Sequence, residues 1–399
     1  MSQSNKIQGP DPARPPQPAS GSAALRSAPL GPEPVGENPP ERVVAHGAAA
    51  AAGIATPSSG RTRASIVDVA ERAGVSVATV SRALRDMPNV SAASRERVLR
   101  AAAELEYTAS PLASGLVTGK IRSVGVVTPY AGRWFFAEVV RGIEEALREG
   151  GYDLVLHVLA DANRRAAFFA DLPVRRRVDA VLIVALPMDP AELTVLHGLD
   201  LPLACVGEPM PGVHGERIDN IASARLATQH LINLGHTRIA MIGGDPDGPE
   251  RFGVPGLRAQ GYREAMAGAG LPVRPEWDLD GRFTAKGGEL AMTSLLSASL
   301  GRPTAVFCQS DEMAFGALRA LRRTGLRCPD DVSIIGFDDH ELAETFDVTT
   351  ISQPVAAQGA AAARWLIDRL NGLPPAAEDE ARIHPVRLVL RGSTGPYTG

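Results

Sequence analysis

Apolar residues first recur at helical spacing just after Ser65. Ser65 and Asp68 stand at the spacing of a capping box, in which a serine N-cap is followed three residues later by an acid. Gly74 then supplies a residue that can end the helix. The apolar stripe between them consists of Val69, Ala70 and Ala73. The pattern therefore predicts a short amphipathic helix that ends in a tight turn.

Two more helices are predicted directly after this turn. Ser76 can cap a helix over residues 77–84, and Ser91 can cap a third over residues 92–106. The side chains of the third helix expected to face a core are Val98, Leu99, Ala102 and Leu105. A helix, a glycine-containing turn and a second helix in so few residues form a helix-turn-helix candidate.

From Ile121 onward the pattern changes to short β-branched runs that alternate with amphipathic helices. A helix is expected over residues 136–149. The expected strands are residues 123–128, 153–158, 180–185, 203–206, 238–242, 305–309 and 332–337. Apolar strands separated by helices are typical of a parallel, doubly wound α/β sheet. This region is longer than one core usually holds, so two such lobes are expected.

Composition changes this picture mainly at the N-terminus. The chain has 399 residues, and residues 1–60 are mostly Pro, Ala, Gly and Ser, which predicts a disordered tail. This tail lacks the basic and apolar regions of a signal peptide, and no apolar run is long enough for a membrane span. Cys205, Cys308 and Cys328 lie far apart, which favours a reducing, cytoplasmic location.

Charge is unevenly distributed along the chain. The whole chain carries a formal net charge of -4. By region, residues 1–60 are about neutral, residues 61–120 carry about +3, and the remainder carries about −7. A small basic module followed by a large acidic domain is expected when only the first part contacts phosphate.

Hydroxyl and guanidinium groups gather on the second helix of the helix-turn-helix. In this motif the second helix enters the major groove, while hydroxyls and backbone N–H groups hold phosphates. Ser76, Thr79 and Ser81 supply hydroxyls, and Arg82 has the reach for a bidentate contact to guanine. These residues predict binding to double-stranded DNA.

The same segment resembles the headpiece of the LacI/GalR family of bacterial transcription regulators. Residues 66–84 read IVDVAERAGVSVATVSRAL, and the likeness continues to Tyr107. The resemblance implies that Val77, Ala78 and Arg82 face the bases. Arg85, and Asn89 in the following loop, stand at further positions that contact DNA in the family.

The resemblance also covers the linker after the headpiece. Residues 109–120 resemble the hinge helix of the family, which orders on DNA. The leucine of that helix corresponds to Leu116. As a wedge in the minor groove, Leu116 would unstack a base step and kink the duplex.

The large domain resembles the effector domain of the same family, whose core is like that of periplasmic sugar-binding proteins. Markers include the runs 234–236, 311–318 and 330–339, and the resemblance extends over about residues 64–396. It implies two lobes joined by three crossovers, which we place near Asp219, Arg327 and Gln353. The expected domains are a tail (1–60), a headpiece (61–108), a hinge (109–120), an N-terminal lobe (121–218 with 328–353) and a C-terminal lobe (219–327 with 354–399).

Four residues are candidates for binding a small-molecule effector between the lobes, beyond the carboxyl ends of the strands. Asp311 follows a predicted strand, and the resemblance implies that its carboxylate accepts hydrogen bonds from sugar hydroxyls. Arg258 matches an effector-binding arginine and offers a planar fork of donors. The resemblance implies that Phe283 stands where an aromatic ring packs against the sugar, and Trp134, just past the first predicted strand, is the candidate for a second stacking wall.

The sequence shows no feature of an enzyme or of a cofactor or metal site. It has no phosphate loop, no nucleophile elbow and no His spacing of a metal site. The combined residues and resemblance predict a homodimeric transcriptional regulator, most simply a repressor, that binds a pseudo-palindromic operator and a carbohydrate effector. The alternative is a cytoplasmic small-molecule receptor of the same core fold that binds no operator.

Overall fold

The computed structural model describes residues 64–84, 87–107, 121–245, 253–298, 301–374 and 381–398. The predicted tail, the predicted hinge with Leu116, and Arg85 lie outside these residues. None of the helices in the described ranges has both the length and the apolar character needed to cross a membrane.

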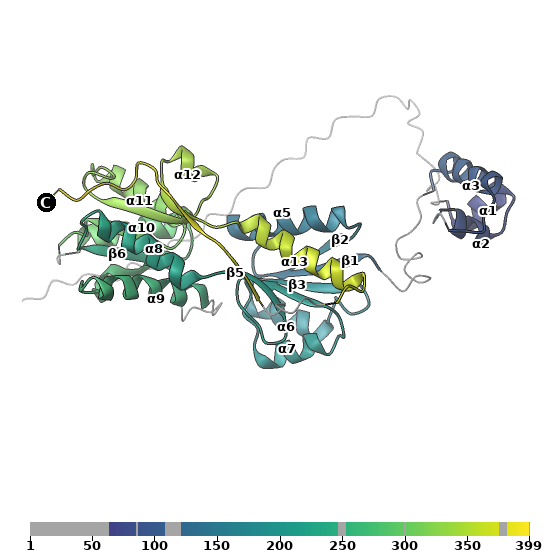
Figure 1. Ribbon diagram of the computed structural model, residues 1–399, viewed down its shortest axis with the longest axis horizontal. Helices are drawn as coiled ribbons and strands as arrows, with labels where there is room; N and C mark the ends of the chain where they lie inside the picture. Colours follow the sequence, from purple (N-terminus) through teal and green to yellow (C-terminus); the bar gives the residue numbers. More distant parts are fainter. Residues whose placement is uncertain are drawn as a thin grey trace, which may run out of the picture. The chain divides into compact units, whose positions relative to one another are not determined.

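The headpiece forms three helices around its own small core (Figure 1). They are α1 (Ile66–Ala73), α2 (Val77–Leu84) and α3 (Ala92–Glu104). Ser65 and Asp68 form the predicted capping box, and Gly74 ends α1 in the left-handed conformation with φ 63°. The side chains of Val69, Val80 and Val98 are fully buried where the three helices meet.

The prediction for α3 was wrong in two respects. Leu99 was expected in the core, but it is 51% exposed. Val98, Ala101 and Ala102 occupy the buried face, and one residue corresponds to about 100° of rotation around the helix. The helix also ends at Glu104, two residues earlier than expected.

The rest of the chain forms two parallel sheets, which confirms the predicted doubly wound α/β architecture. Sheet A has the order β11-β5-β4-β3-β1-β2, and sheet B has the order β12-β10-β9-β8-β6-β7. The strands of sheet A are β1 (Ser123–Thr128), β2 (Asp153–Val158), β3 (Ala180–Val184), β4 (Leu203–Val206), β5 (His214–Ile218) and β11 (Ala381–His384). The strands of sheet B are β6 (Ile239–Gly243), β7 (Asp278–Asp280), β8 (Ala305–Cys308), β9 (Ser333–Asp338), β10 (Thr349–Ser352) and β12 (Arg387–Val389). Among the strands that the structure describes, only β12 pairs antiparallel, against β10.

Helices cover both faces of each sheet. The first lobe is the one that contains sheet A, and the second lobe contains sheet B. On one face of sheet A, α5 (Trp134–Glu149) packs together with α13 (Val355–Leu370). The other face is covered by α6 (Ala162–Asp171) and α7 (Pro190–His197) (Figure 1). In the second lobe, α8 (Asn220–Asn233) pairs with α9 (Gly253–Gly268), and α10 (Ala285–Ser297) pairs with α11 (Asp311–Arg323). A short helix, α12 (Leu342–Thr345), follows β9, and a single 3₁₀ turn (Pro275–Trp277) precedes β7.

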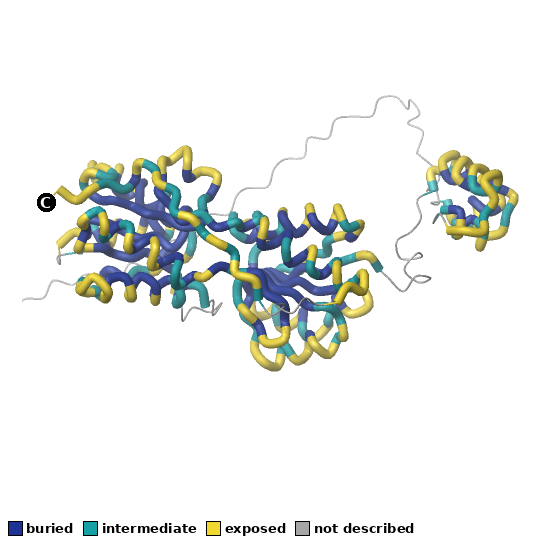
Figure 2. The backbone as a smooth tube through the Cα atoms, viewed as in Figure 1, coloured by how far each residue is buried: buried dark blue, intermediate teal, exposed yellow. Residues whose placement is uncertain are grey.

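Alternating strand residues fill the two cores of the second lobe. Ala240, Ile242 and Val306 pack toward α10 and α11, whereas Met241 and Phe307 pack toward α8 and α9. This alternation follows from the two-residue repeat of a strand, and it explains why the strands are apolar at nearly every position. Figure 2 shows both sheets as buried layers between helices whose outer faces are exposed.

Two of the three predicted crossovers are where they were placed, and one is not. The chain passes from sheet A to sheet B after Ile218 and returns after β10, at Gln353. The third passage lies between β11 and β12, not near Arg327. Residues 328–353 therefore belong to the second lobe, because β9 pairs with β8 and β10 pairs with β9. Helix α13 and strand β11, expected in the second lobe, belong to the first.

Candidate functional site

One face of α2 is exposed and carries the side chains predicted to meet DNA. Val77 is 41% exposed, and Ala78 and Arg82 are also exposed, while Val80 and Ala83 on the opposite face are buried in the headpiece core. This division leaves two small apolar groups and one guanidinium on the same outward surface. Such a surface can contact thymine methyl groups and a guanine edge.

The start of α2 is organised by hydroxyl groups. The Ser76 hydroxyl lies 2.9 Å from the Thr79 hydroxyl and accepts a hydrogen bond from the Thr79 backbone N–H at 3.2 Å. Ser81 is half-buried, and Asn89 is exposed with a left-handed φ of 73°. Contacts of Ser76, Thr79, Ser81 and Asn89 with DNA stay predictions.

A cleft lies between the two lobes. Its volume is about 800 Å³ when the open space at its entrance is included. The first lobe contributes the start of α5 and the loop after β4, and the second lobe contributes α9 and the ends of β8 and β9. Its apolar walls are Phe135, Phe136, Ala185, Ile218, Val254, Pro255 and Phe283. Its polar or charged lining residues are Arg133, Glu208, Asn220, Arg258, Ser310, Glu312, Asp338, Gln353 and Gln358. The cleft therefore offers apolar surface for a ring and several hydrogen-bonding groups.

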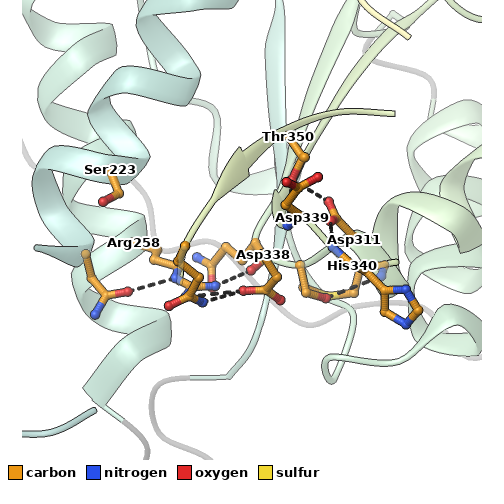
Figure 3. A network of polar contacts seen from close by, with 12 residues as sticks. Ser223, Arg258, Asp311, Asp338, Asp339, His340 and Thr350 are labelled. Atoms are coloured by element: carbon orange, nitrogen blue, oxygen red, sulfur yellow. Dashed lines mark hydrogen bonds and ion pairs between the residues drawn. The ribbon is translucent and has the colours of Figure 1, made fainter. Parts of the chain in front are cut away.

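Arg258 and Asp338 form the polar centre of this cleft (Figure 3). The Arg258 Nε donates to Asn220 Oδ1 at 2.9 Å, one terminal nitrogen donates to the Gln309 carbonyl, and the other lies 3.8 Å from Asp338 Oδ1. The guanidinium also lies 3.6 Å from the centre of the Phe337 ring. Burial lowers the pKa of Arg258 to about 10, so it remains cationic at neutral pH. Burial raises the pKa of Asp338 to about 6, although the charge of Arg258 opposes this rise.

A chain of two glutamines connects Asp338 to the first lobe. Gln353 Nε2 donates to Asp338 Oδ1 at 2.6 Å, and Gln358 Nε2 donates to Gln353 Oε1 at 3.2 Å. Gln353 lies at the crossover after β10, and Gln358 lies on α13. These hydrogen bonds therefore link the centre of the cleft to a helix that covers sheet A.

The prediction for Asp311 requires a correction. Its carboxylate is fully buried and does not line the cleft. It accepts hydrogen bonds from the Thr350 hydroxyl at 2.7 Å and from the His340 backbone N–H at 2.8 Å (Figure 3). Burial, reinforced by the nearby charge of Asp338, raises the pKa of Asp311 well above its usual value. Asp338 is an aspartate that lines the cleft, and its signal in the sequence was its position at the end of a mostly apolar strand, β9.

The two aromatic candidates lie in different places. Phe283 lines the cleft and packs over Gly244, where a Cβ atom would collide with the ring. Trp134 is not among the lining residues and stacks on His340, with ring centres 4.7 Å apart. Because Trp134 begins α5 and His340 follows β9, this stack joins the two lobes beside the cleft.

Comparisons with known proteins identify the family to which both parts of the chain are similar. The family model "Bacterial regulatory proteins, lacI family" matches residues 65–110, and "Periplasmic binding protein-like domain" matches residues 228–394. The HTH-type transcriptional repressor CytR of Escherichia coli (strain K12) is 37% identical over 342 residues, which is 84% of this chain and 97% of that protein. The ribose operon repressor of Haemophilus influenzae is 33% identical over 312 residues, covering 77% of this chain and 92% of that protein.

Solved structures of transcriptional regulators are similar to this chain as well. A lac repressor dimer bound to operator and the anti-inducer ONPF is similar with a TM-score of 0.74 and 27% identity, covering 84% of this chain and 100% of that chain. A complex of the transcriptional regulator CelR with cellobiose has a TM-score of 0.61 and 34% identity, covering 83% and 100%. The chain therefore belongs to the lacI family of bacterial regulatory proteins, which consists of transcriptional regulators rather than enzymes. It is a DNA-binding transcriptional regulator.

Proposed function

We propose that this protein is a cytoplasmic repressor that binds a pseudo-palindromic operator as a homodimer and responds to a carbohydrate effector in the cleft. The exposed face of α2, with Val77, Ala78 and Arg82, carries the proposal, because a receptor without operator binding has no need of it. The relatives that are named as repressors support repression rather than activation. The sugar-bound structures of CelR with cellobiose and of an Enterococcus faecium regulator with ribose support the ligand class.

The proposed control is a linkage between the cleft and the headpiece. An effector that contacts both Arg258 of the second lobe and Phe135 of the first favours one relative position of the lobes. The hydrogen bonds from Asp338 through Gln353 to Gln358 couple the relative position of the lobes to α13. Since binding free energies are reciprocal, operator DNA must change effector affinity by the same factor, typically equivalent to about 1–3 kcal/mol.

A surface on the second lobe supports the dimer. Phe315 and Phe346 pack with ring centres 5.0 Å apart and line a groove together with Leu318, Arg319 and Arg322. The side chain of Phe346 is 37% exposed, and Leu342 on the adjacent α12 is 42% exposed. Exposed apolar clusters of this kind mark protein interfaces, and the operator-bound lac repressor relative is a dimer.

The test is a gel shift with the DNA upstream of the protein's own gene. We expect a sequence-specific band that weakens as salt rises, because phosphate contacts release counterions. Arg82→Ala should weaken operator binding by about 1–3 kcal/mol, roughly 5- to 150-fold, through loss of a base contact. Arg100→Ala is the matched control, since Arg100 is an exposed arginine of α3 that pairs with Glu96. An unchanged band for Arg82→Ala, or no specific band for the wild type, contradicts the proposal.

A further inference from the structure

The cleft contains more acidic than basic side chains. Among its lining residues, the acids are Glu208, Glu312 and Asp338, and the cations are Arg133 and Arg258. Burial raises the pKa of both Glu208 and Glu312, which reflects their partial removal from water. A ligand that enters this cleft therefore meets carboxylates in a region that screens charge less than bulk water does.

Both cations are already engaged by the protein. Arg258 is held by Asn220, by the Gln309 carbonyl and by the charge of Asp338. The Arg133 guanidinium lies 3.6 Å from the centre of the Tyr130 ring, and its charge lowers the pKa of Glu312 against the effect of burial. An anionic ligand would have to compete for either guanidinium.

The carboxylate of Glu208 occupies the N-terminus of α9. Glu208 follows β4 in the first lobe, and its carboxylate accepts hydrogen bonds from the backbone N–H groups of Gly253 and Val254 at the start of α9 in the second lobe. A Cβ atom on Gly253 would lie 2.9 Å from Glu208 Oε1, so glycine permits this close approach. The first N–H groups of a helix are natural partners of phosphate and carboxylate groups. Here the protein's own carboxylate takes them.

We propose that Glu208 is a selectivity residue that restricts the cleft to uncharged effectors and excludes phosphate esters and carboxylates. It acts in two ways, by repelling a second anion and by holding the N–H groups of α9. The apolar face of an uncharged ring packs on Phe135, Phe136 and Phe283, and its hydroxyl or N–H groups donate to Asp338. The proposal rests on the proposed effector site and narrows its ligand class.

The first experiment is calorimetric titration of the full chain with inorganic phosphate at constant ionic strength. We expect no saturable heat with the wild type and a saturable phosphate site in Glu208→Ala, because the N–H groups of α9 become available. Asp153→Ala is the matched control, since Asp153 is an exposed acidic residue of β2 outside the cleft, and its removal changes the charge without freeing the start of a helix. We expect no phosphate site in this variant. If circular dichroism shows that Glu208→Ala is unfolded, Glu208→Ser replaces it.

The second experiment is a thermal-shift comparison of ribose, glucose, adenosine and cytidine with their phosphate esters. Any compound that stabilises the wild type should be the uncharged member of its pair, by at least about tenfold in apparent affinity. A wild-type preference for a phosphate ester, or the absence of phosphate binding in folded Glu208→Ala, overturns the proposal. The operator gel shift of the ligand-free variant is measured separately, so failure of the proposed regulator function is distinguishable from failure of this inference.

Discussion

Asp338 and Asp311 show how two buried carboxylates near neighbouring strand ends divide their roles. Asp338 ends β9 and faces the cleft, where Arg258 lies beside it. Asp311 begins α11, and its two oxygens are taken by Thr350 and by the His340 backbone. Only the first is placed to bind a ligand, whereas the second connects α11, the loop after β9, and β10.

The raised pKa of Asp338 makes stability depend on pH. Its native pKa of about 6 lies above the ordinary 3.8, so the native state binds the proton more tightly than the unfolded state. The resulting stabilisation is complete below the ordinary pKa and is lost as the pH rises through about 6. The rise in the pKa of Asp338 from 3.8 to about 6 corresponds to about 3 kcal/mol of unfolding free energy.

Asp338→Asn should remove this contribution. We expect the unfolding free energy of the wild type to rise, relative to the variant, by up to about 3 kcal/mol as the pH falls from about 7 to about 4. Denaturant titrations at each pH measure the difference. Asp161→Asn makes the same charge change at the exposed N-cap of α6 and serves as the control for the loss of one carboxylate. A constant difference for Asp338→Asn would show that its proton does not contribute to folding.

At the residue scale the sequence identified the types of side chain better than their contacts. Arg258 and Phe283 line the cleft, and their contact with an effector stays a prediction. Asp311 and Trp134 do not line the cleft, and Leu99 does not lie in the core. A carboxylate near a strand end is visible in the sequence. The Thr350 hydroxyl that donates to the Asp311 carboxylate lies on a strand 39 residues away, and no local sequence pattern predicts that hydrogen bond.

At the scale of elements, glycines set how closely α5 and α13 can approach. A Cβ atom on Gly142 of α5 would collide with the Ala356 carbonyl of α13, and one on Gly359 of α13 would collide with the Val139 carbonyl of α5. The two helices cover one face of sheet A, and α5 begins with residues that line the cleft. Their close packing therefore supports one wall of the binding site.

Gly142→Ala should destabilise the protein even though alanine favours helices. We expect a loss of about 1–3 kcal/mol from overpacking, because the obstructing atom belongs to backbone and cannot rotate away. Gly268→Ala is the control, since Gly268 ends α9 and has open space around its Cβ position. That control should be neutral or stabilising by up to about 1 kcal/mol. Thermal denaturation of the two variants checks the opposite signs, and stabilisation by Gly142→Ala would contradict the packing argument.

Strand positions were predictable from the sequence, but their sheet membership was not. The bounds of β1, β2 and β4 agree with the expected ranges, because β-branched runs between helices define them locally. Residues 328–353 were assigned to the wrong lobe, because β9 and β10 would be equally apolar in either sheet. Which neighbour a buried strand pairs with depends on tertiary packing.

At the scale of the whole molecule, operator binding and dimerisation should be inseparable. Two half-sites need two headpieces, and the groove beside Phe315 and Phe346 is the surface proposed to hold the second copy. A charge placed there would be desolvated on association and would oppose it.

Phe346→Asp should therefore give a folded monomer that loses most of its operator affinity. Analytical ultracentrifugation measures the mass, and the gel shift measures binding to the operator. The control is Leu373→Asp, because Leu373 is also an exposed apolar residue, 54% exposed, but lies after α13 in the first lobe. If the Phe346→Asp protein is still a dimer, the interface lies on another surface and the prediction is wrong.

The third crossover has a consequence for how the chain folds during synthesis. Strand β11 completes one edge of sheet A only after nearly all of sheet B has left the ribosome, and β12 follows it immediately. The headpiece has a core formed from residues within 66–107 and requires none of these later strands. A nascent chain can therefore possess a folded headpiece while one edge of each sheet still awaits its last strand, so the DNA-reading surface is complete before the sensor that is proposed to dimerise and to bind the effector.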